Sequence, residues 1–139
     1  MLLQPASAIT AGAVLLTVIG IAYGGTFMLR VVTGKQGANA LQKSFFRAGH
    51  AHAGVLVILG LVVLVLMDAA RITGWAHASA IGVLATAILI PAGFFFSAIG
   101  RDPQKPNRAI ALVWAGFAVL LASMIVAGVA LIVAGASAL

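Results

Sequence analysis

Acidic residues are almost absent from this chain: its 139 residues include only two, Asp68 and Asp102. Both stand at the edges of long segments that contain no charged residue. These segments cover residues 5–29, 48–67, 72–100 and 109–139. Because a helix rises about 1.5 Å per residue, about 20 residues cross a hydrocarbon core of about 30 Å. Each segment meets that length, so the sequence predicts a bilayer protein with four transmembrane helices.

Cysteine is missing altogether, which excludes disulfides, thiolate metal sites and thiol nucleophiles. The hydrophobic fraction of 63% and the mean hydropathy of +1.21 exceed those of soluble domains. A net charge of +6 would suggest a nucleic-acid partner in a soluble protein. Here the basic residues border apolar segments, where membrane topology explains them, and we expect no nucleic-acid partner.

The apolar segments also lack any carboxylate. A proton-coupled exchanger needs one inside the membrane, so we do not expect transport by this chain alone. Asp68 ends the second apolar segment close to Arg71, and we expect the two to form a solvated surface pair. The sequence shows no nucleophile with a neighbouring base and no soluble domain. It therefore predicts a protein with no catalytic residues, no cofactor and no metal site.

Basic residues define the expected orientation. Seven of them lie in the first and third connections: Arg30, Lys35, Lys43, Arg47, Arg101, Lys105 and Arg108. The second connection contains only Arg71. The positive-inside bias then places the first and third connections in the cytoplasm, where their basic residues contact lipid headgroups, and both termini outside it. We expect a multi-pass protein of a bacterial inner (plasma) membrane, with an uncleaved first helix.

The predicted spans are residues 8–32, 48–67, 76–100 and 108–136, within one domain that covers residues 1–139. Short connections favour an all-α membrane fold, an antiparallel up-down-up-down bundle of four helices. Asn39 is a candidate cap for a short separate helix along the membrane surface, before the second span. Asn107 is a candidate cap for the fourth span.

Small residues recur at four-residue spacing, which lets helix backbones approach closely in lipid. Such pairs either close the bundle or leave one groove open for a partner, and the sequence leaves both outcomes open. Three consecutive phenylalanines add aromatic surface to the third span. The candidate packing or partner-binding residues are Gly20, Gly24, Gly82, Gly93, Ser97, Phe94, Phe95 and Phe96. Tyr23, beside Gly24, is expected to be buried with its hydroxyl bonded to a carbonyl oxygen.

The sequence RAGHAHAG at residues 47–54 is the one group of residues that could bind a metal ion or take part in a reaction. On a helix, residues two positions apart point about 200° apart, so His50 and His52 cannot bind one metal ion together. At most one is expected to point into the bundle, and His77 belongs at the opposite membrane surface. We interpret these histidines as interfacial or packing groups. Because ionisable groups in membranes often mark sites, a haem or quinone held by His50 or His52 remains an alternative.

The whole chain resembles a group of small four-helix integral membrane proteins of high-GC actinobacteria. The resemblance lies in the sequences LRVVTG and SFFRAGHAHAGVL and in the turn before PNR, and it implies no activity. A second resemblance is to the MAPEG superfamily, trimeric four-helix enzymes of glutathione and eicosanoid metabolism. The residues that match the start of their second helix are Arg47, Ala48, Ala51 and His52. Gly54 and Val57 stand where that pattern has asparagine and glutamate.

The predicted function is that of a non-enzymatic polytopic membrane protein, an accessory or regulatory subunit of a larger membrane complex such as a lipid transporter. Membrane lipids and that complex are the expected partners, and a homo-oligomer is compatible with the sequence. Two alternatives remain open. One is a redox protein that uses His50 or His52 to hold haem or quinone, and the other, implied by resemblance, is a MAPEG-like membrane enzyme.

Overall fold

The computed structural model describes residues 3–139, and this part of the chain is helical without strands. The elements are α1 (Pro5–Val32), α2 (Ala40–Ala69), α3 (Gly74–Ser97), the short 3-10 helix η1 (Arg108–Ile110) and α4 (Ala111–Ala136). All four α-helices are long and apolar enough to cross a membrane. The predicted all-α, four-helix membrane fold is confirmed.

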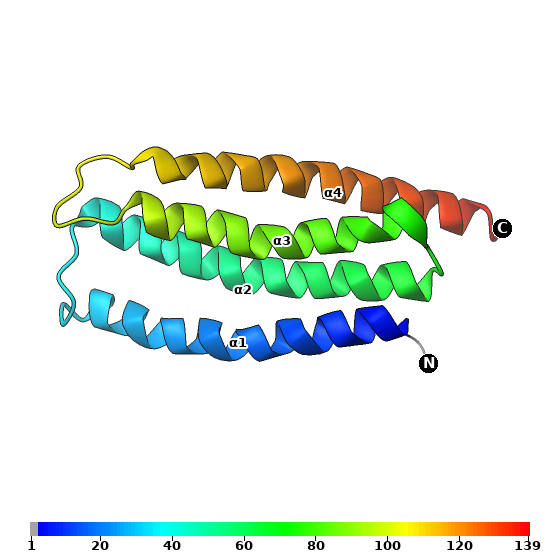
Figure 1. Cartoon of the computed structure of the whole chain (residues 1–139), viewed down its shortest axis with the longest axis horizontal. Coiled ribbons are helices and arrows are strands. Elements are labelled where there is room, and N and C mark those ends of the chain that lie inside the picture. Colours follow the sequence, from blue (N-terminus) through cyan, green and yellow to red (C-terminus); the bar gives the residue numbers. More distant parts are fainter. Residues whose placement is uncertain (1–2) are drawn as a thin grey trace.

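The four helices alternate in direction and follow one another as a row (Figure 1). α3 packs against α2 and α4, and α1 packs against α2, whereas α1 and α4 make no helix–helix contact within the described residues. The bundle is therefore open, with α2 and α3 at its centre. Both termini lie at the end that carries the turn 70–73, here called the terminal end. The connections 33–39 and 98–107 lie at the opposite end, here called the loop end (Figure 1).

The start of α2 corrects one expectation. Asn39 caps the helix as predicted: its side chain accepts the N–H of Gln42 at 2.9 Å, and the Gln42 side chain accepts the N–H of Asn39 at 3.1 Å. The capped helix is not a separate surface segment, because α2 continues without a break from Ala40 to Ala69. No glycine or proline interrupts residues 40–48, so nothing in the local sequence ends the helix there.

Asn107 also caps a helix as predicted. Its side-chain oxygen accepts the N–H of Ala109 at 2.8 Å, at the start of η1. Its side-chain nitrogen donates to the Phe96 carbonyl at 2.9 Å, and its backbone N–H donates to the Ser97 carbonyl at 2.9 Å. One asparagine thus joins the end of α3 to the start of the fourth span and closes the 98–107 connection.

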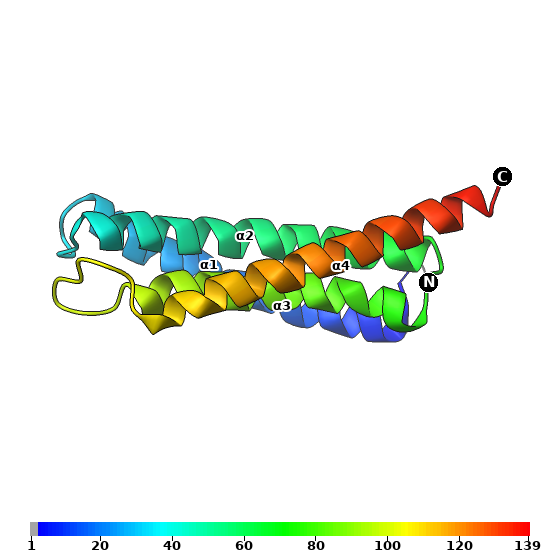
Figure 2. The same cartoon turned by 90° about the horizontal axis from the view of Figure 1, so that it is seen from above.

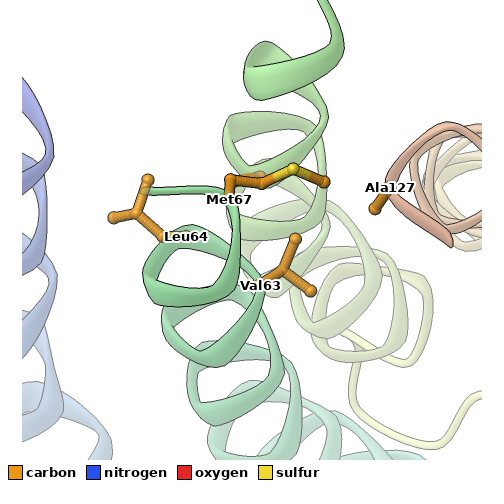
Figure 3. Packing of buried hydrophobic residues seen from close by; sticks show 5 residues of the cluster. Val63, Leu64, Met67 and Ala127 are labelled. Atoms are coloured by element: carbon orange, nitrogen blue, oxygen red, sulfur yellow. The ribbon is translucent and has the colours of Figure 1, made fainter. Parts of the chain in front are cut away.

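Two groups of buried apolar side chains form the core. Figure 3 shows the one nearer the terminal end, where Val63 and Met67 of α2 point toward α3 and Ala127 of α4, and Leu64 of α2 points toward α1. The second contains Leu56, Ile90 and Val113, nearer the loop end. Both groups surround α3, which explains why α3 is the best-covered helix while α1 and α4 keep broad exposed apolar faces.

Glycines permit the close approach of α3 and α4. A Cβ at Gly93 would lie 2.6 Å from Val113 Cγ2 and 2.7 Å from the Val113 backbone nitrogen, and a Cβ at Gly82 would collide with the Ser123 side chain. In lipid, helix association depends on such van der Waals contact at small residues. These two positions therefore set the distance between α3 and α4.

Candidate functional site

The two neighbouring histidines lie on different sides of α2. The His50 ring lies over α1, where a Cβ at Gly24 would be 3.6 Å from its Nδ1 atom and a Cβ at Gly25 would be 3.8 Å from its Nε2 atom. The His52 ring lies 5.3 Å from the Phe94 ring of α3 and 6.1 Å from the Phe117 ring of α4. The rings diverge because successive helical residues turn by about 100°.

Both histidines point toward a neighbouring helix, whereas the sequence predicted at most one inward ring. The reason is the open row: α2 has α1 on one side and α3 on the other, so two opposite faces of α2 are interfaces. The Nδ1 atom of His52 donates to the Ala48 carbonyl, 2.7 Å away and one turn earlier. With its proton on Nδ1, the neutral ring keeps its acceptor lone pair on Nε2.

The first of the two acidic residues, Asp68, anchors a polar cluster at the terminal end. The carboxylate of Asp68 accepts a hydrogen bond from His77 Nε2 at 2.7 Å and from the backbone N–H of Gln4 at 2.8 Å. The hydroxyl of Ser7 lies 3.4 Å from the same His77 nitrogen. The Asp68 side chain has no exposed surface. Here, the end of α2, the first turn of α3 and the start of α1 meet.

This polar cluster corrects the predicted surface pair. Arg71 is exposed and makes no ion pair with Asp68, and within the described chain the one salt-bridge contact is between Asp68 and His77. The carboxylate points inward because Asp68 follows the fully buried Leu64 by one helical turn, on the same face of α2. The pairing with His77 depends on how α3 returns across the turn.

The polar cluster contains the residue types of a Ser-His-Asp triad but not its arrangement. In such a triad the carboxylate binds one ring nitrogen, and the other nitrogen takes the serine proton. Here Asp68 and Ser7 approach the same atom, Nε2 of His77. Because that nitrogen donates its proton to Asp68, it cannot deprotonate Ser7. The cluster acts as a polar tie between three helices.

A second polar network ties the loop end. The buried side-chain amide of Gln42 donates to the carbonyl oxygens of Ala98 at 3.1 Å and Gly100 at 2.9 Å. The side-chain nitrogen of Asn39 donates to Asp102 Oδ1 at 2.8 Å and to the Pro103 carbonyl at 2.7 Å. The capping pair of α2 therefore also fixes the α3–α4 connection. The sequence revealed the caps but not these long-range bonds.

The aromatic run of α3 is mostly internal. Phe94 contacts Phe45 edge to face at 5.5 Å, and Phe95 stacks on Phe46 at 5.5 Å. Phe96 alone points outward, with 53% of its surface exposed. Aromatic rings at these separations stabilise the contact by more than the burial of their apolar surface alone. The run therefore joins α3 to α2 and offers one exposed ring rather than a continuous surface.

The remaining candidate residues divide by environment. Gly24 lies under His50, whereas a Cβ at Gly20 would meet no atom within 4 Å. Ser97 is buried, and its hydroxyl donates to the Phe94 carbonyl at 3.2 Å. Tyr23 is 77% exposed, which corrects its predicted burial. Since Gly24 and Gly25 face α2, a residue one step earlier lies about 100° farther round the helix and points outward.

The candidate headgroup residues are all exposed and belong to the loop end: Arg30, Lys35, Lys43, Arg47, Arg101, Lys105 and Arg108. No three histidine, aspartate or glutamate side chains in residues 3–139 cluster in a way that could hold a metal ion. The three histidines lie apart: His50 lies between α1 and α2, His52 lies among α2, α3 and α4, and His77 lies at the terminal end.

Comparisons with known protein families, with curated proteins and with solved structures found no match.

Proposed function

We propose that this membrane protein is a non-enzymatic accessory subunit of a larger membrane complex, such as a lipid transporter, and that α1 contacts the partner. The loop end then faces the cytoplasm, in agreement with its basic charge. Support for the role of α1 comes from its position at the edge of the open row. α1 packs mainly against α2, with a contact from Ser7 to His77 of α3, so most of its length is uncovered by the chain itself.

The uncovered face of α1 has the spacing of a helix-packing seam. Exposed residues recur at alternating steps of three and four, which keep one stripe of a helix facing a second helix. The stripe consists of Ile9, Gly12, Leu16, Ile19, Tyr23, Thr26 and Arg30. Gly12 adds a small residue of the kind that lets membrane helices approach closely. We call these residues the α1 stripe.

Tyr23 is the observation that carries the proposal. α1 is about 42 Å long at 1.5 Å per residue, and Tyr23 lies about 7 Å from its midpoint. Helical side chains lean toward the N-terminus, which directs the Tyr23 hydroxyl toward the centre of the span. Its hydroxyl has no hydrogen-bond partner within residues 3–139, and the side chain is 77% exposed. An unpaired hydroxyl in hydrocarbon is costly, and an acceptor on a partner helix removes that cost.

The other hydroxyls of α1 do not need a partner. Thr17 donates to the Val14 carbonyl at 2.6 Å, and Thr26 donates to the Tyr23 carbonyl at 2.7 Å. Both bonds stay within the helix, as threonine side chains commonly arrange in membranes. Tyr23 therefore differs from Thr17 and Thr26, because its hydroxyl points away from α1 and forms no hydrogen bond within the helix.

Site-specific cross-linking tests the proposal. A photoreactive residue at Ile19, in the α1 stripe, is expected to cross-link a distinct membrane protein in native membranes. The matched position is Ile132 of α4, which is similarly exposed (73% against 69% at Ile19) and apolar. Equal cross-linking from both positions would contradict a specific role for α1. Cross-links only to a second copy of the chain would replace the accessory role by self-assembly.

One observation favours a second candidate function, a haem- or quinone-associated redox protein. The bond from His52 Nδ1 to the Ala48 carbonyl leaves Nε2 as the acceptor atom, the form in which imidazole binds metal or a quinol hydroxyl. A visible absorption spectrum of freshly purified protein tests this candidate. A Soret band lost in His52→Ala but kept in His50→Ala would support haem binding at His52, and a featureless spectrum would contradict haem binding.

A further inference from the structure

We propose that the free face of α2 at the loop end binds the phosphate of an anionic phospholipid through Lys43 and Arg47, with an acyl chain of that lipid along α2. This site lies on a different helix from the α1 stripe. It therefore does not depend on whether α1 docks a partner.

The headgroup end of this site is a shallow recess on α2. Lys43 and Arg47 are exposed and one helical turn apart, with the hydroxyl of Ser44 beside them. The rest of the lining consists of small side chains, Ala40, Ala48 and Ala51, and the recess has a volume of about 560 Å³. Because the alanines are short, they leave space between the two long cationic side chains. An anion of the size of a phosphate group fits in this space.

The charges at the recess are complementary to an anion. The two acidic side chains are engaged elsewhere: Asp102 accepts a hydrogen bond from Asn39, and Asp68 lies at the terminal end with His77. Neither Lys43 nor Arg47 has an acidic partner among the described residues. Two like charges one turn apart repel each other on a helix, and a phosphate between them removes this repulsion. The guanidinium adds paired donors, and the ammonium adds a point charge.

An apolar track continues from the recess toward the membrane centre. Ala51, Val55, Ile58 and Val62 follow Arg47 at steps of four, four, three and four, which keeps them on one face of α2. Val55 and Ile58 are 63% and 65% exposed. From Ala51 to Val62 the helix rises about 16 Å, close to half of a hydrocarbon core of about 30 Å. The track therefore has the length of one leaflet.

The open row leaves this face of α2 free. α1 and α3 cover other sides of α2, and α4 makes little contact with it. In Figure 2, α2 lies along one edge of the molecule, with α3 on its other side. A cationic recess at the membrane surface, followed by an apolar track one leaflet long, matches a phospholipid rather than a soluble phosphate. A soluble phosphate would occupy only the recess and would leave the apolar track uncovered.

Native mass spectrometry of the purified full chain tests this site. Adducts are compared for phosphatidylglycerol and phosphatidylcholine with identical acyl chains. We expect wild type to retain phosphatidylglycerol preferentially. Lys43→Gln/Arg47→Gln should weaken this retention about tenfold or more, since each basic residue near an anionic surface adds to the attraction. The matched control is Lys35→Gln/Lys105→Gln, which removes two exposed charges at the same end and should leave retention unchanged.

Three results would overturn the proposal. The first is equal retention of the two lipids by wild type, since the recess would then not select an anion. The second is an equal loss in the control variant, which would indicate the overall charge of the loop end. The third is displacement of the lipid by millimolar glycerol phosphate, which would indicate a soluble ligand. Circular dichroism of each variant verifies that helicity is unchanged.

Discussion

The buried carboxylate of Asp68, in the last turn of α2, accepts a 2.7 Å hydrogen bond from Nε2 of His77 in the first turn of α3. The same carboxylate accepts the backbone N–H of Gln4, immediately before α1. One side chain therefore links three helices at the terminal end. This link has particular weight for α1, since α2 is the main helix against which α1 packs.

Replacement of Asp68 should loosen the terminal end. We expect Asp68→Asn to lower the free energy of unfolding by about 1–3 kcal/mol, because the amide keeps one acceptor oxygen and places an NH2 donor against the donor group of His77 or Gln4. Thermal unfolding in mild detergent measures this change. Arg71→Ala is the matched control and should have little effect. If Arg71→Ala destabilises the protein as much as Asp68→Asn does, Asp68 is paired with Arg71 instead.

Leucine substitutions at glycines should separate internal packing from exposed surface. Gly93→Leu should destabilise the isolated chain by about 1–3 kcal/mol or more, because the new side chain overlaps the Val113 backbone. Gly20→Leu should be tolerated, since a Cβ there meets nothing within 4 Å. Melting curves of the two variants in one detergent make the comparison. A larger loss at Gly20 than at Gly93 would contradict the packing described for α3 and α4.

Gln42 should contribute more to stability than an ordinary residue in the first turn of a helix, because it also bonds to the 98–107 connection. Gln42→Ala removes one half of the capping box and both bonds to the Ala98 and Gly100 carbonyls. We expect a loss of about 1–3 kcal/mol and faster proteolysis of the 98–107 connection. Gln36→Ala changes the same residue type at an exposed position and should be neutral. Unchanged proteolysis of the Gln42 variant would show that these bonds do not hold the connection.

Orientation in the membrane can be read by cysteine labelling, because the natural chain has no cysteine. Ser137→Cys should react with an impermeant thiol reagent in intact cells, and Ser44→Cys should react only after the membrane is opened. Both positions are exposed in the structure, so access depends on the side of the membrane. The reverse pattern would place the loop end outside the cell.

Features decided by local chemistry were predictable from the sequence. The four apolar helices follow from the charge-free segments, and Asn39 and Asn107 follow from the preference of asparagine for helix starts. The divergence of His50 and His52 follows from helix geometry alone. Each of these inferences needs only residues that lie close together in the chain.

Features decided by helix neighbours were not predictable. Whether Tyr23 faces α2 or the outside depends on which face of α1 packs, and an apolar sequence on all sides does not reveal that face. The same holds for Asp68, whose partner His77 is supplied by α3 rather than by Arg71, its neighbour in sequence. His50 and His52 both reached interfaces because the row is open, a property of the whole arrangement.

The central claim is that α1 binds a partner through the stripe around Tyr23, and quantitative co-purification from native membranes tests it most directly. Tyr23→Phe removes only the hydroxyl, and Thr17→Val removes a hydroxyl already bonded within α1. We expect the ratio of partner to tagged chain to fall about threefold to tenfold or more in Tyr23→Phe, from the loss of one hydrogen bond. The ratio should be unchanged in Thr17→Val. An unchanged ratio in Tyr23→Phe would contradict the claim.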